Sequence, residues 1–430
     1  MTAAALDNTL IRRRDWLTIL VVGIAHAGSH FFQLVIPSLY LPLGREFGLD
    51  FAQLGLLVSA FFVTSGLGQA SSGFVVDRVG ARPVLWFGLA CFVLSGILLG
   101  TANGYTMLFV AAVIAGVGNA VFHPVDFSIL NRRVSAPRLG HAFSAHGLTG
   151  SLGWALTPVF MITLTQLHGW RVAAFGASAV VGAVLVLTLV ARKLLDGEIG
   201  EQDSAKEGAP VAPAVGPTTV AGTLAALLAK PALWGAFLFF AMGSIAFSAV
   251  QNYTIPLLGS LYALSAVAAS SALSGYMVAS ATGILAGGFL VSTTPRTERI
   301  VAASLCLAGL MLVLLALGGV PAWLAAPAVA LAGFFSGLAG PSRDMLIRRV
   351  TPRGSLGSVY GLVYSGMDVG AALGPLVFGL MLDAGWRHGP WLGAALAFAA
   401  AAGLAALIAR AARAQEASSA ATAVAPRPAA

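Results

Sequence analysis

Charged residues are scarce in this chain: Asp, Glu, Lys and Arg make up 9% of the 430 residues, whereas 58% are hydrophobic and the mean hydropathy is +0.88. A water-soluble globule needs far more polar side chains to cover its surface, so the composition excludes one. Apolar runs of roughly 20 residues recur along the chain, the length a helix needs to cross a bilayer. We therefore expect an all-α membrane protein surrounded by lipid.

Cysteines and enzyme motifs are also few. The two cysteines, Cys91 and Cys306, fall in separate apolar runs, where we expect them to pack rather than to form a disulfide. The sequence has no GxxxxGK[ST] loop for a nucleotide phosphate, and neither GxSxG nor HExxH. We therefore expect no enzyme activity, no cofactor and no ATP drive within this chain.

The basic residues are distributed unevenly between the loops. If the N-terminus is cytoplasmic, only Arg45, Arg171 and Arg387 of the 24 Lys and Arg lie in outer loops. The net charge of +8 therefore follows the positive-inside rule and does not indicate a nucleic-acid partner. This predicts a multi-pass protein of a bacterial inner (plasma) membrane, with both termini in the cytoplasm. Twelve candidate spans begin near Trp16, Phe51, Pro83, Tyr105, His141, Trp170, Pro231, Ala266, Ile300, Pro321, Gly357 and Pro390.

The two halves of the chain repeat one another. A polar segment separates them, so we divide the chain into a six-helix bundle (1–193), a cytoplasmic linker (194–229), a second six-helix bundle (230–412) and a disordered cytoplasmic tail (413–430). Glycines and prolines of the two halves match without gaps at an offset of 217 residues. The matched pairs are Gly116 with Gly333, Pro124 with Pro341, Gly140 with Gly357, Gly153 with Gly370, and Pro158 with Pro375.

The most polar short loop lies between the second and third spans. It reads GFVVDRVGARP from Gly73 to Pro83, and its GxxxDRxGxR spacing resembles the loop between helices two and three of major facilitator superfamily (MFS) transporters. The resemblance implies twelve helices in two pseudo-symmetric six-helix bundles, with substrate bound between them. It also implies a cytoplasmic gate in which Asp77 faces the start of helix eleven, near Gly357, and which includes Gly73, Arg78, Gly80 and Arg82.

The first span carries a polar face. His26, His30 and Gln33 are spaced four and three residues apart, so they share one side of a helix. In this fold the first helix lines the central cavity, which predicts a place on the substrate or proton pathway. Alternatively, the two histidines only bond a neighbouring helix. We predict no metal site, because nothing nearby in the sequence supplies a third ligand.

The fourth span repeats this pattern with Asn119, His123 and Asp126. An ionisable residue inside a span is a functional candidate, although Asp126 could also simply lie near water at the cytoplasmic end. Drug/proton antiporters of the family carry an arginine at the position of Ala112, so an antiport mechanism that relies on that arginine is in doubt. The repeat aligns Asp126 with Arg343, which predicts an ion pair that closes the cytoplasmic gate.

Three further residues complete the predicted pathway. His146 lies in the fifth span, and Asn252 in the seventh corresponds to Gln33 if Pro256 is aligned with Pro37. Asp368 lies about eleven residues from the inner end of its span, near mid-membrane at roughly 1.5 Å per residue. An ionised carboxylate is costly there, as a proton carrier requires. The alternative is a carboxyl group bonded to a hydroxyl such as that of Tyr364.

Together these features predict a secondary active transporter of a small organic solute, coupled to protons and working as a monomer. The VFHP sequence of 121–124 resembles bacterial exporters of the fosmidomycin-resistance type, which favours export. An uptake carrier for an organic anion is the main alternative, because histidines and Arg343 would attract an anion. A membrane receptor or enzyme that has kept the fold is a remote alternative.

Overall fold

The computed structural model describes residues 3–196, 231–291, 294, 296–350 and 356–424, and every regular element in these ranges is helical. Eleven helical segments of this described part are long and apolar enough to cross a membrane. The 31-residue helix α1 (Ala3–Gln33) packs among them and brings the set to twelve, with His26, His30 and Gln33 as polar residues along it. The expected all-α membrane protein is confirmed.

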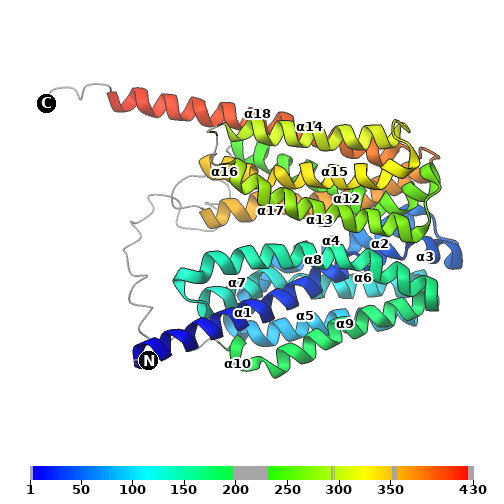
Figure 1. Ribbon diagram of the computed structural model, residues 1–430, viewed down its shortest axis with the longest axis horizontal. Helices are drawn as coiled ribbons and strands as arrows, with labels where there is room; N and C mark the ends of the chain where they lie inside the picture. The colour runs from blue at the N-terminus through cyan, green and yellow to red at the C-terminus, as the bar shows by residue number, and fades with distance from the viewer. Residues whose placement is uncertain (1–2, 197–230, 292–293, 295, 351–355, 425–430) are drawn as a thin grey trace.

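The helices form two groups that lie one above the other in Figure 1, with both termini at the same end of the molecule. We call this the terminal end, and the opposite one the far end. After α1, the first group contains α2 (Val35–Ser38), α3 (Tyr40–Phe47), α4 (Phe51–Val79), α5 (Ala81–Gly100), α6 (Tyr105–Asn119), α7 (Phe122–Arg133), α8 (Ala136–His168), α9 (Trp170–Val190) and α10 (Arg192–Leu195). The second contains α12 (Pro231–Tyr262), α13 (Ala266–Leu290), α14 (Thr297–Ala316), α15 (Ala322–Leu338), α16 (Gly340–Val350), α17 (Leu356–Asp383) and α18 (Gly389–Val424).

The fourth span of each group is broken at the same place. α6 gives way to α7 just before Pro124, and α15 gives way to α16 just before Pro341. Proline cannot donate the helical hydrogen bond and its ring crowds the preceding turn, so a break is expected there. The repeated prolines therefore mark a repeated kink.

The repeated glycines mark the closest helix crossings. A Cβ on Gly116 of α6 would lie 2.4 Å from the Phe61 carbonyl oxygen of α4, and one on Gly333 of α15 would lie 2.3 Å from the Tyr276 oxygen of α13. These distances are shorter than any real Cβ contact, so only glycine fits where the backbones meet. The same crossing thus occurs once in each half.

A second pair of glycines sets the packing of the first and fifth spans. A Cβ on Gly153 of α8 would lie 2.2 Å from the Ala27 oxygen of α1, and one on Gly370 of α17 would lie 2.4 Å from the Ala241 oxygen of α12. Because Gly153 and Gly370 are equivalent, Ala27 is equivalent to Ala241, an offset of 214 residues.

The two halves meet along α4 with α17 and along α8 with α13. At the far end the backbone N–H groups of Phe51 and Ala52 donate to Asp383 Oδ1 and Oδ2 at 2.9 and 2.7 Å. Tyr40 Oη also donates to Asn252 Oδ1 at 3.3 Å. A carboxylate at a helix N-terminus satisfies free N–H groups and the helix dipole, so these contacts hold the far end closed.

The spacing between α4 and α17 increases toward the terminal end. Gly55, Gly66 and Gly73 lie on one face of α4, because steps of 11 and 7 residues are about three and two helical turns. A Cβ on Gly55 would lie 2.3 Å from the Pro375 oxygen, and one on Gly66 would lie 3.2 Å from the Asp368 Cβ. A Cβ on Gly73 would meet no described atom within 4 Å.

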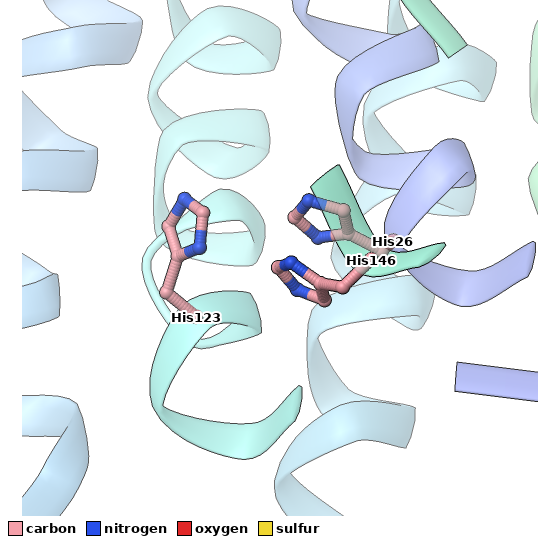
Figure 2. A group of neighbouring side chains, drawn as sticks. All are labelled: His26, His123 and His146. Atoms are coloured by element: carbon pink, nitrogen blue, oxygen red, sulfur yellow. The ribbon is translucent and has the colours of Figure 1, made fainter. Parts of the chain in front are cut away.

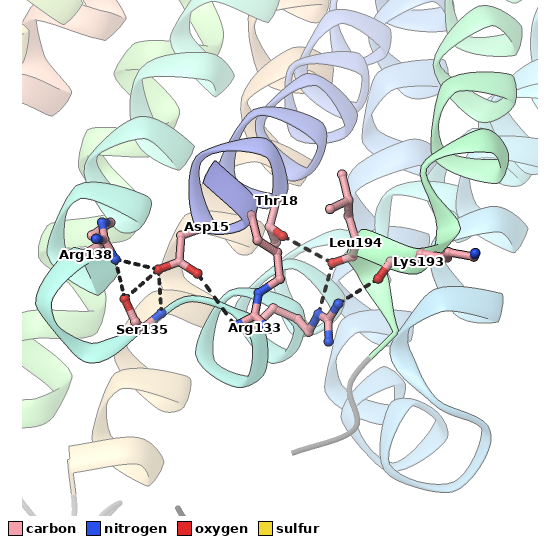
Figure 3. A network of polar contacts seen from close by, with 8 residues as sticks. Asp15, Thr18, Arg133, Ser135, Arg138, Lys193 and Leu194 are labelled. Carbon is pink, nitrogen blue, oxygen red and sulfur yellow. Dashed lines mark hydrogen bonds and ion pairs between the residues drawn. The ribbon is translucent and has the colours of Figure 1, made fainter. Parts of the chain in front are cut away.

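A buried polar network fixes the terminal end of the first half (Figure 3). Asp15 of α1 is fully buried, and its Oδ2 accepts hydrogen bonds from Ser135 Oγ at 2.5 Å and Arg138 Nη1 at 2.9 Å. Arg133 Nε donates to the Leu194 carbonyl at 3.2 Å, which caps the short helix α10. These contacts fasten the ends of α1, α7, α8 and α10 to one another.

Some expected boundaries differ from the structure. α1 begins at Ala3 rather than near Trp16, and α18 continues to Val424, so residues 413–424 are helical and not the disordered tail we expected. Alanine has the highest helix propensity, and the segment after Arg413 is rich in it. The proposed linker begins inside α10, where Leu195 is buried. Residues 197–230, which contain the rest of it, lie outside the described residues.

Candidate functional site

Four of the seven histidines lie together inside the first half. His26 and His30 come from α1, His123 from α7 and His146 from α8 (Figure 2 shows three of them). The His26 ring stacks on that of His146 with centroids 3.5 Å apart, and lies 4.4 Å from His30 and 5.3 Å from His123. The spacing in the sequence predicted a shared face for His26 and His30, and the fold adds the other two.

Asp126 is the acidic member of this group, and its side chain is 0% exposed. Its Oδ2 lies 3.0 Å from His26 Nδ1 and 3.1 Å from His146 Nε2, while its Oδ1 has no hydrogen-bond partner. The alternative that Asp126 is simply near water is therefore wrong. We call His26, His30, His123, His146 and Asp126 the imidazole cluster.

Two local features of the backbone allow the imidazole cluster to form. A Cβ on Gly150 would lie 2.9 Å from His30 Nδ1 and 3.0 Å from His26 Nε2, so glycine leaves the space that the rings occupy. The break between α6 and α7 comes just before His123. It reorients the first turn of α7, which carries both His123 and Asp126.

The predicted gate partner of Asp126 is placed differently. Arg343 of α16 donates from Nε to Asp344 Oδ1 at 2.8 Å, and its guanidinium lies 5.0 Å from the centre of the Phe240 ring. Asp126 has its two imidazole neighbours in its own half. A pair between Asp126 and Arg343 would require the carboxylate to leave the imidazole cluster, which the sequence repeat did not indicate.

A chain of amide contacts continues from the imidazole cluster toward the far end. Gln33 Nε2 donates to Asn119 Oδ1 at 3.0 Å, and Asn119 Nδ2 donates to Ser65 Oγ at 2.7 Å. Trp154 Nε1 donates to Gln33 Oε1 at 2.9 Å. The Trp154 ring also lies 5.2 Å from Phe247 of α12, in the opposite half. The predicted pathway residues Gln33 and Asn119 are therefore in direct contact, beside an aromatic pair that spans the seam.

Asn252 lies apart from this group. It is 3% exposed and donates to the Ser248 carbonyl at 2.8 Å while it accepts from Tyr40, so it belongs to the closed far end. The alignment of Pro256 with Pro37 is wrong by five residues, because the packing of the two halves gives an offset of 214 in these helices. Phe247, not Asn252, is the counterpart of Gln33.

Asp368 lies on the seam between the halves. It is partly buried, and its Cβ would be 3.2 Å from a Cβ on Gly66 of α4. The side chain of Tyr364, its predicted alternative partner, lies outside the described residues. Asp368 is thus placed where α4 and α17 begin to separate.

The conserved-looking loop spacing forms a turn at the terminal end. Gly80 has φ of 92°, a conformation that favours glycine, and it separates α4 from α5. Arg82 forms an ion pair with Asp196, and Arg132 lies 3.9 Å from the exposed Asp77. A pocket of about 200 Å³ lies beside them. The first side chains of α17, where we expected the partner of Asp77, lie outside the described residues, so that contact stays a prediction.

The sequence argument against a metal site fails in one respect. One ligand atom each from His26, His123 and His146 can be chosen so that all three lie within 4.8 Å of one another. We had expected no third ligand near His26 and His30, because only residues close in sequence were considered. The third and fourth imidazoles come from helices about 100 and 120 residues further along the chain.

Trp154 and Asp15 were missed by the sequence interpretation. Trp154 is eight residues after His146 on the same face of α8, a spacing that could have identified it. Asp15 follows Arg12, Arg13 and Arg14, which had been considered only as cytoplasmic positive charge. No local signal shows that Asp15 is buried against Ser135, because the contact joins residues 120 positions apart.

Comparison with known proteins decides the family. The model described as Major Facilitator Superfamily matches residues 19–324 and 247–430. The chain belongs to this superfamily. Its members are secondary transporters and not enzymes, as the absence of enzyme motifs had predicted.

The fold is also that of this superfamily in solved structures. A bacterial homologue of the human lysosomal transporter Spinster, described as inward-facing and unoccupied, superposes with a TM-score of 0.70 at 16% identity, covering 92% of this chain and 96% of that one. At this identity the likeness supports the fold alone.

Relatives in sequence carry different substrates. The fosmidomycin resistance protein of Escherichia coli K12 is 30% identical over 191 residues, 44% of this chain and 47% of that protein, so the match spans about half of it. The probable nitrate/nitrite transporter NarK2 of Mycobacterium tuberculosis H37Rv is 27% identical over 81% of this chain and 85% of its own. The probable L-galactonate transporter of E. coli K12 is 23% identical over 38% of this chain and 36% of its own.

Proposed function

We propose that this superfamily member is a proton-coupled exporter of a small organic solute and that it works by alternating access. The observation that carries the proposal is the graded contact along α4. Gly55 touches the backbone of α17, Gly66 faces Asp368, and Gly73 meets no described atom. Two bundles in contact at one end and separating toward the other can rock about the contact and expose the region between them to one side at a time.

Asp368 is our choice for the residue that couples proton movement to this rocking. A ligand shifts a two-state equilibrium only if its free energy differs between the states, and the same holds for a proton. The surroundings of Asp368 include Gly66 of the other half, so they would change as the halves move. Asp126 has its contacts within one half, and rigid-body rocking would leave them unaltered. The committed proton pathway through His26, His30, His123 and Asp126 therefore becomes secondary in our proposal.

The substrate contact that we propose lies where Trp154 meets Phe247. Each residue belongs to a different half, and their rings are 5.2 Å apart. The Gln33 and Asn119 amides adjoin Trp154 on one side, and Tyr276 lies 6.0 Å from Phe247 on the other. An apolar or aromatic solute with a polar group would suit this combination of rings and amides.

We infer export from orientation and resemblance. The basic residues favour cytoplasmic termini in a bacterial inner membrane, which makes the closed far end periplasmic. The VFHP sequence and the relative named for fosmidomycin resistance favour efflux of a toxic solute. We propose that a single chain is sufficient, because the seam and both gates lie within it.

The test begins in a deletion strain that carries the wild-type gene or a variant on a plasmid. A panel of toxic compounds, with fosmidomycin first, is compared for growth inhibition. A compound that the protein exports is then given to everted membrane vesicles loaded with a pH-sensitive dye, and solute-dependent proton flux is measured. Export predicts increased sensitivity of the deletion strain and a flux that collapses when the pH gradient is removed.

The residue test uses Asp368→Asn, with Asp50→Asn as the matched control. Asp50 caps α4 at the exposed far end by accepting from the Gln53 N–H at 2.7 Å, and asparagine caps a helix about equally well. We expect Asp368→Asn to abolish solute-dependent proton flux and Asp50→Asn to retain it. Equal flux in the two variants would remove Asp368 from the mechanism, and transport that ignores the pH gradient would remove proton coupling.

Uptake of an organic anion is the second candidate, because of the sequence relatives named for L-galactonate and for 4-methylmuconolactone. Arg343 and the histidines would attract an anion. Growth of the deletion strain on single organic acids as the carbon source separates the two proposals. Loss of growth on one acid, without a change in sensitivity to the toxic panel, would favour uptake over export.

A further inference from the structure

The imidazole cluster has a geometry that proton-coupled transport does not require. Its nitrogens come from three separate helices, α1, α7 and α8, and one atom each from His26, His123 and His146 can be chosen within 4.8 Å of the others. Figure 2 shows the three rings facing one another, with His123 on one side and His26 and His146 on the other. Three imidazoles and a carboxylate are a donor set that selects a late divalent transition-metal ion over Mg²⁺ or Ca²⁺.

The carboxylate lies where a fourth ligand should be. Asp126 Oδ2 is 3.0 Å from His26 Nδ1 and 3.1 Å from His146 Nε2. Two ligand atoms on a tetrahedral zinc ion, each about 2.0 Å from the metal, are separated by about 3.3 Å. The oxygen and the two nitrogens are thus already at the spacing that shared ligation needs, and His123 would have to approach only slightly.

The hydrogen bonding inside the imidazole cluster is incomplete. His26 Nδ1 and Asp126 Oδ1 have no hydrogen-bond partner, although His26 is 2% exposed and Asp126 is 0% exposed. Buried polar atoms are nearly always paired in folded proteins, and each exception calls for an explanation. A metal ion ligated by the imidazole nitrogen and the carboxylate would satisfy both atoms.

We propose that His26, His123, His146 and Asp126 bind one Zn²⁺-class ion inside the first half. The geometry gives each ligand a fixed origin: the glycine at 150 leaves space for the His26 and His30 rings, and the break before α7 orients His123 and Asp126. His30 lies beside the site, 4.4 Å from His26 between ring centroids, and is placed to accept or orient a second contact. Binding at this site would not depend on which solute is transported.

Equilibrium binding to the purified full-length chain in detergent tests the site directly. The protein is first treated with a chelator, and Zn²⁺ binding is then measured by equilibrium dialysis and calorimetry. We expect one Zn²⁺ per chain, retained in excess Mg²⁺. Co²⁺ substituted for Zn²⁺ should give the intense visible absorption of a four-coordinate ion, which reports the ligand set without any measurement of transport.

Variants assign the ligands. His123→Ala and His26→Ala should each weaken Zn²⁺ binding by at least about the 10- to 100-fold that loss of a supporting residue costs at known sites. His141→Ala and His168→Ala are matched controls, because both imidazoles lie on α8 outside the imidazole cluster and are exposed. They should leave affinity, stoichiometry and the Co²⁺ spectrum unchanged. Gel filtration and the thermal unfolding midpoint show whether each variant is folded.

The proposal would be overturned by any of three results. These are wild-type protein that binds no Zn²⁺ above the level of the His26→Ala, His123→Ala double variant, a stoichiometric site that disappears in His141→Ala or His168→Ala, and a Co²⁺ spectrum of six-coordinate type. If His26→Ala fails to fold, His123→Ala with the Co²⁺ spectrum carries the test alone. None of these readouts depends on export or proton coupling, so the metal site and the proposed function fail separately.

Discussion

The two halves of this transporter share a scaffold but not its chemistry. At the packing offsets of the two halves, His26 corresponds to Phe240 and Asp126 corresponds to Arg343. The same two positions are in contact in both halves: Asp126 lies against His26, and the Arg343 guanidinium lies 5.0 Å from the Phe240 ring centre. A duplicated fold has therefore kept a neighbouring pair of positions and changed its occupants from a carboxylate and an imidazole to a cation and an aromatic ring.

The remaining positions of the imidazole cluster carry no titratable residue in the second half. His123 corresponds to Gly340, and His146 corresponds to Val363. Asp368 of the second half corresponds in turn to Ser151. The first half thus contains a concentrated ligand site within a rigid bundle, and the second contributes a single carboxylate on the moving seam. We infer that binding and coupling have been divided between the halves.

The largest effect we predict concerns what the halves share. Gly153→Val and Gly370→Val should each destabilise the protein by at least about 3 kcal/mol, because the added atoms would meet backbone oxygens of α1 or α12 that cannot move aside. Fluorescence-detected gel filtration of the two variants measures the loss of folded protein. Gly147→Val is the control, because its Cβ meets no described atom within 4 Å. Folding of either variant at the level of the control would show that the shared crossing is not essential.

The shared scaffold could be predicted from sequence, whereas the imidazole cluster could be predicted only in part. Glycines and prolines at a fixed offset report local backbone requirements, so Gly153 and Gly370 indicated a repeat without any knowledge of what they contact. His26 and His30 could be grouped because one helix sets their spacing. Their meeting with His123 and His146 depends on how α1, α7 and α8 are rotated against one another, which local spacing does not determine.

The error over Asp126 has the same origin. The repeat places Asp126 and Arg343 at equivalent positions, and we inferred that opposite charges would meet at the gate. Equivalence in a repeat fixes the environment within each half, and not a contact between the halves. Each residue is in contact with its neighbour in its own bundle, His26 for Asp126 and Phe240 for Arg343.

A second prediction compares the polar ties within each half. Asp15→Ala should destabilise the first half by about 2 to 3 kcal/mol, because it removes a fully buried carboxylate from Ser135 and Arg138. Arg413→Ala should cost less than about 1 kcal/mol, because Arg413 is 55% exposed where it donates to Glu298 at 2.6 Å.

Thermal unfolding of purified protein in detergent measures both changes, and Asp15→Asn should fall between them. An Arg413→Ala effect equal to that of Asp15→Ala would contradict the assumption that burial decides the strength of these ties.

A third prediction isolates the substituted pair of the second half. In a double-mutant cycle, Arg343→Gln and Phe240→Leu should show a coupling of about 0.5 to 1 kcal/mol, the size of a partly exposed cation–π contact. The cycle of Arg343→Gln with Phe378→Leu is the control, because Phe378 contacts Tyr253 at the far end. It should give a coupling near zero. Equal coupling in the two cycles would mean that the ring at 240 has no specific role.

The smallest effect belongs to the exposed loops of the first half, at the far end. Glu46 accepts from Trp170 Nε1 at 2.5 Å and pairs with Arg171 at 2.5 Å, and the Trp170 hydrogen bond, more than the arginine, lowers the pKa of Glu46. A lowered pKa in the folded state stabilises the protein above the unfolded pKa near 4.5, and this stabilisation is lost as the pH falls through the folded value. Glu46→Gln should therefore lower the unfolding midpoint slightly at pH 7 and not at all at the acidic end, by less than about 1 kcal/mol because the pair is exposed. Unfolding curves from pH 7 downward, with Asp50→Asn as the comparison, measure this dependence. A difference between wild type and Glu46→Gln that grows toward acid would have the wrong sign for an ionised Glu46.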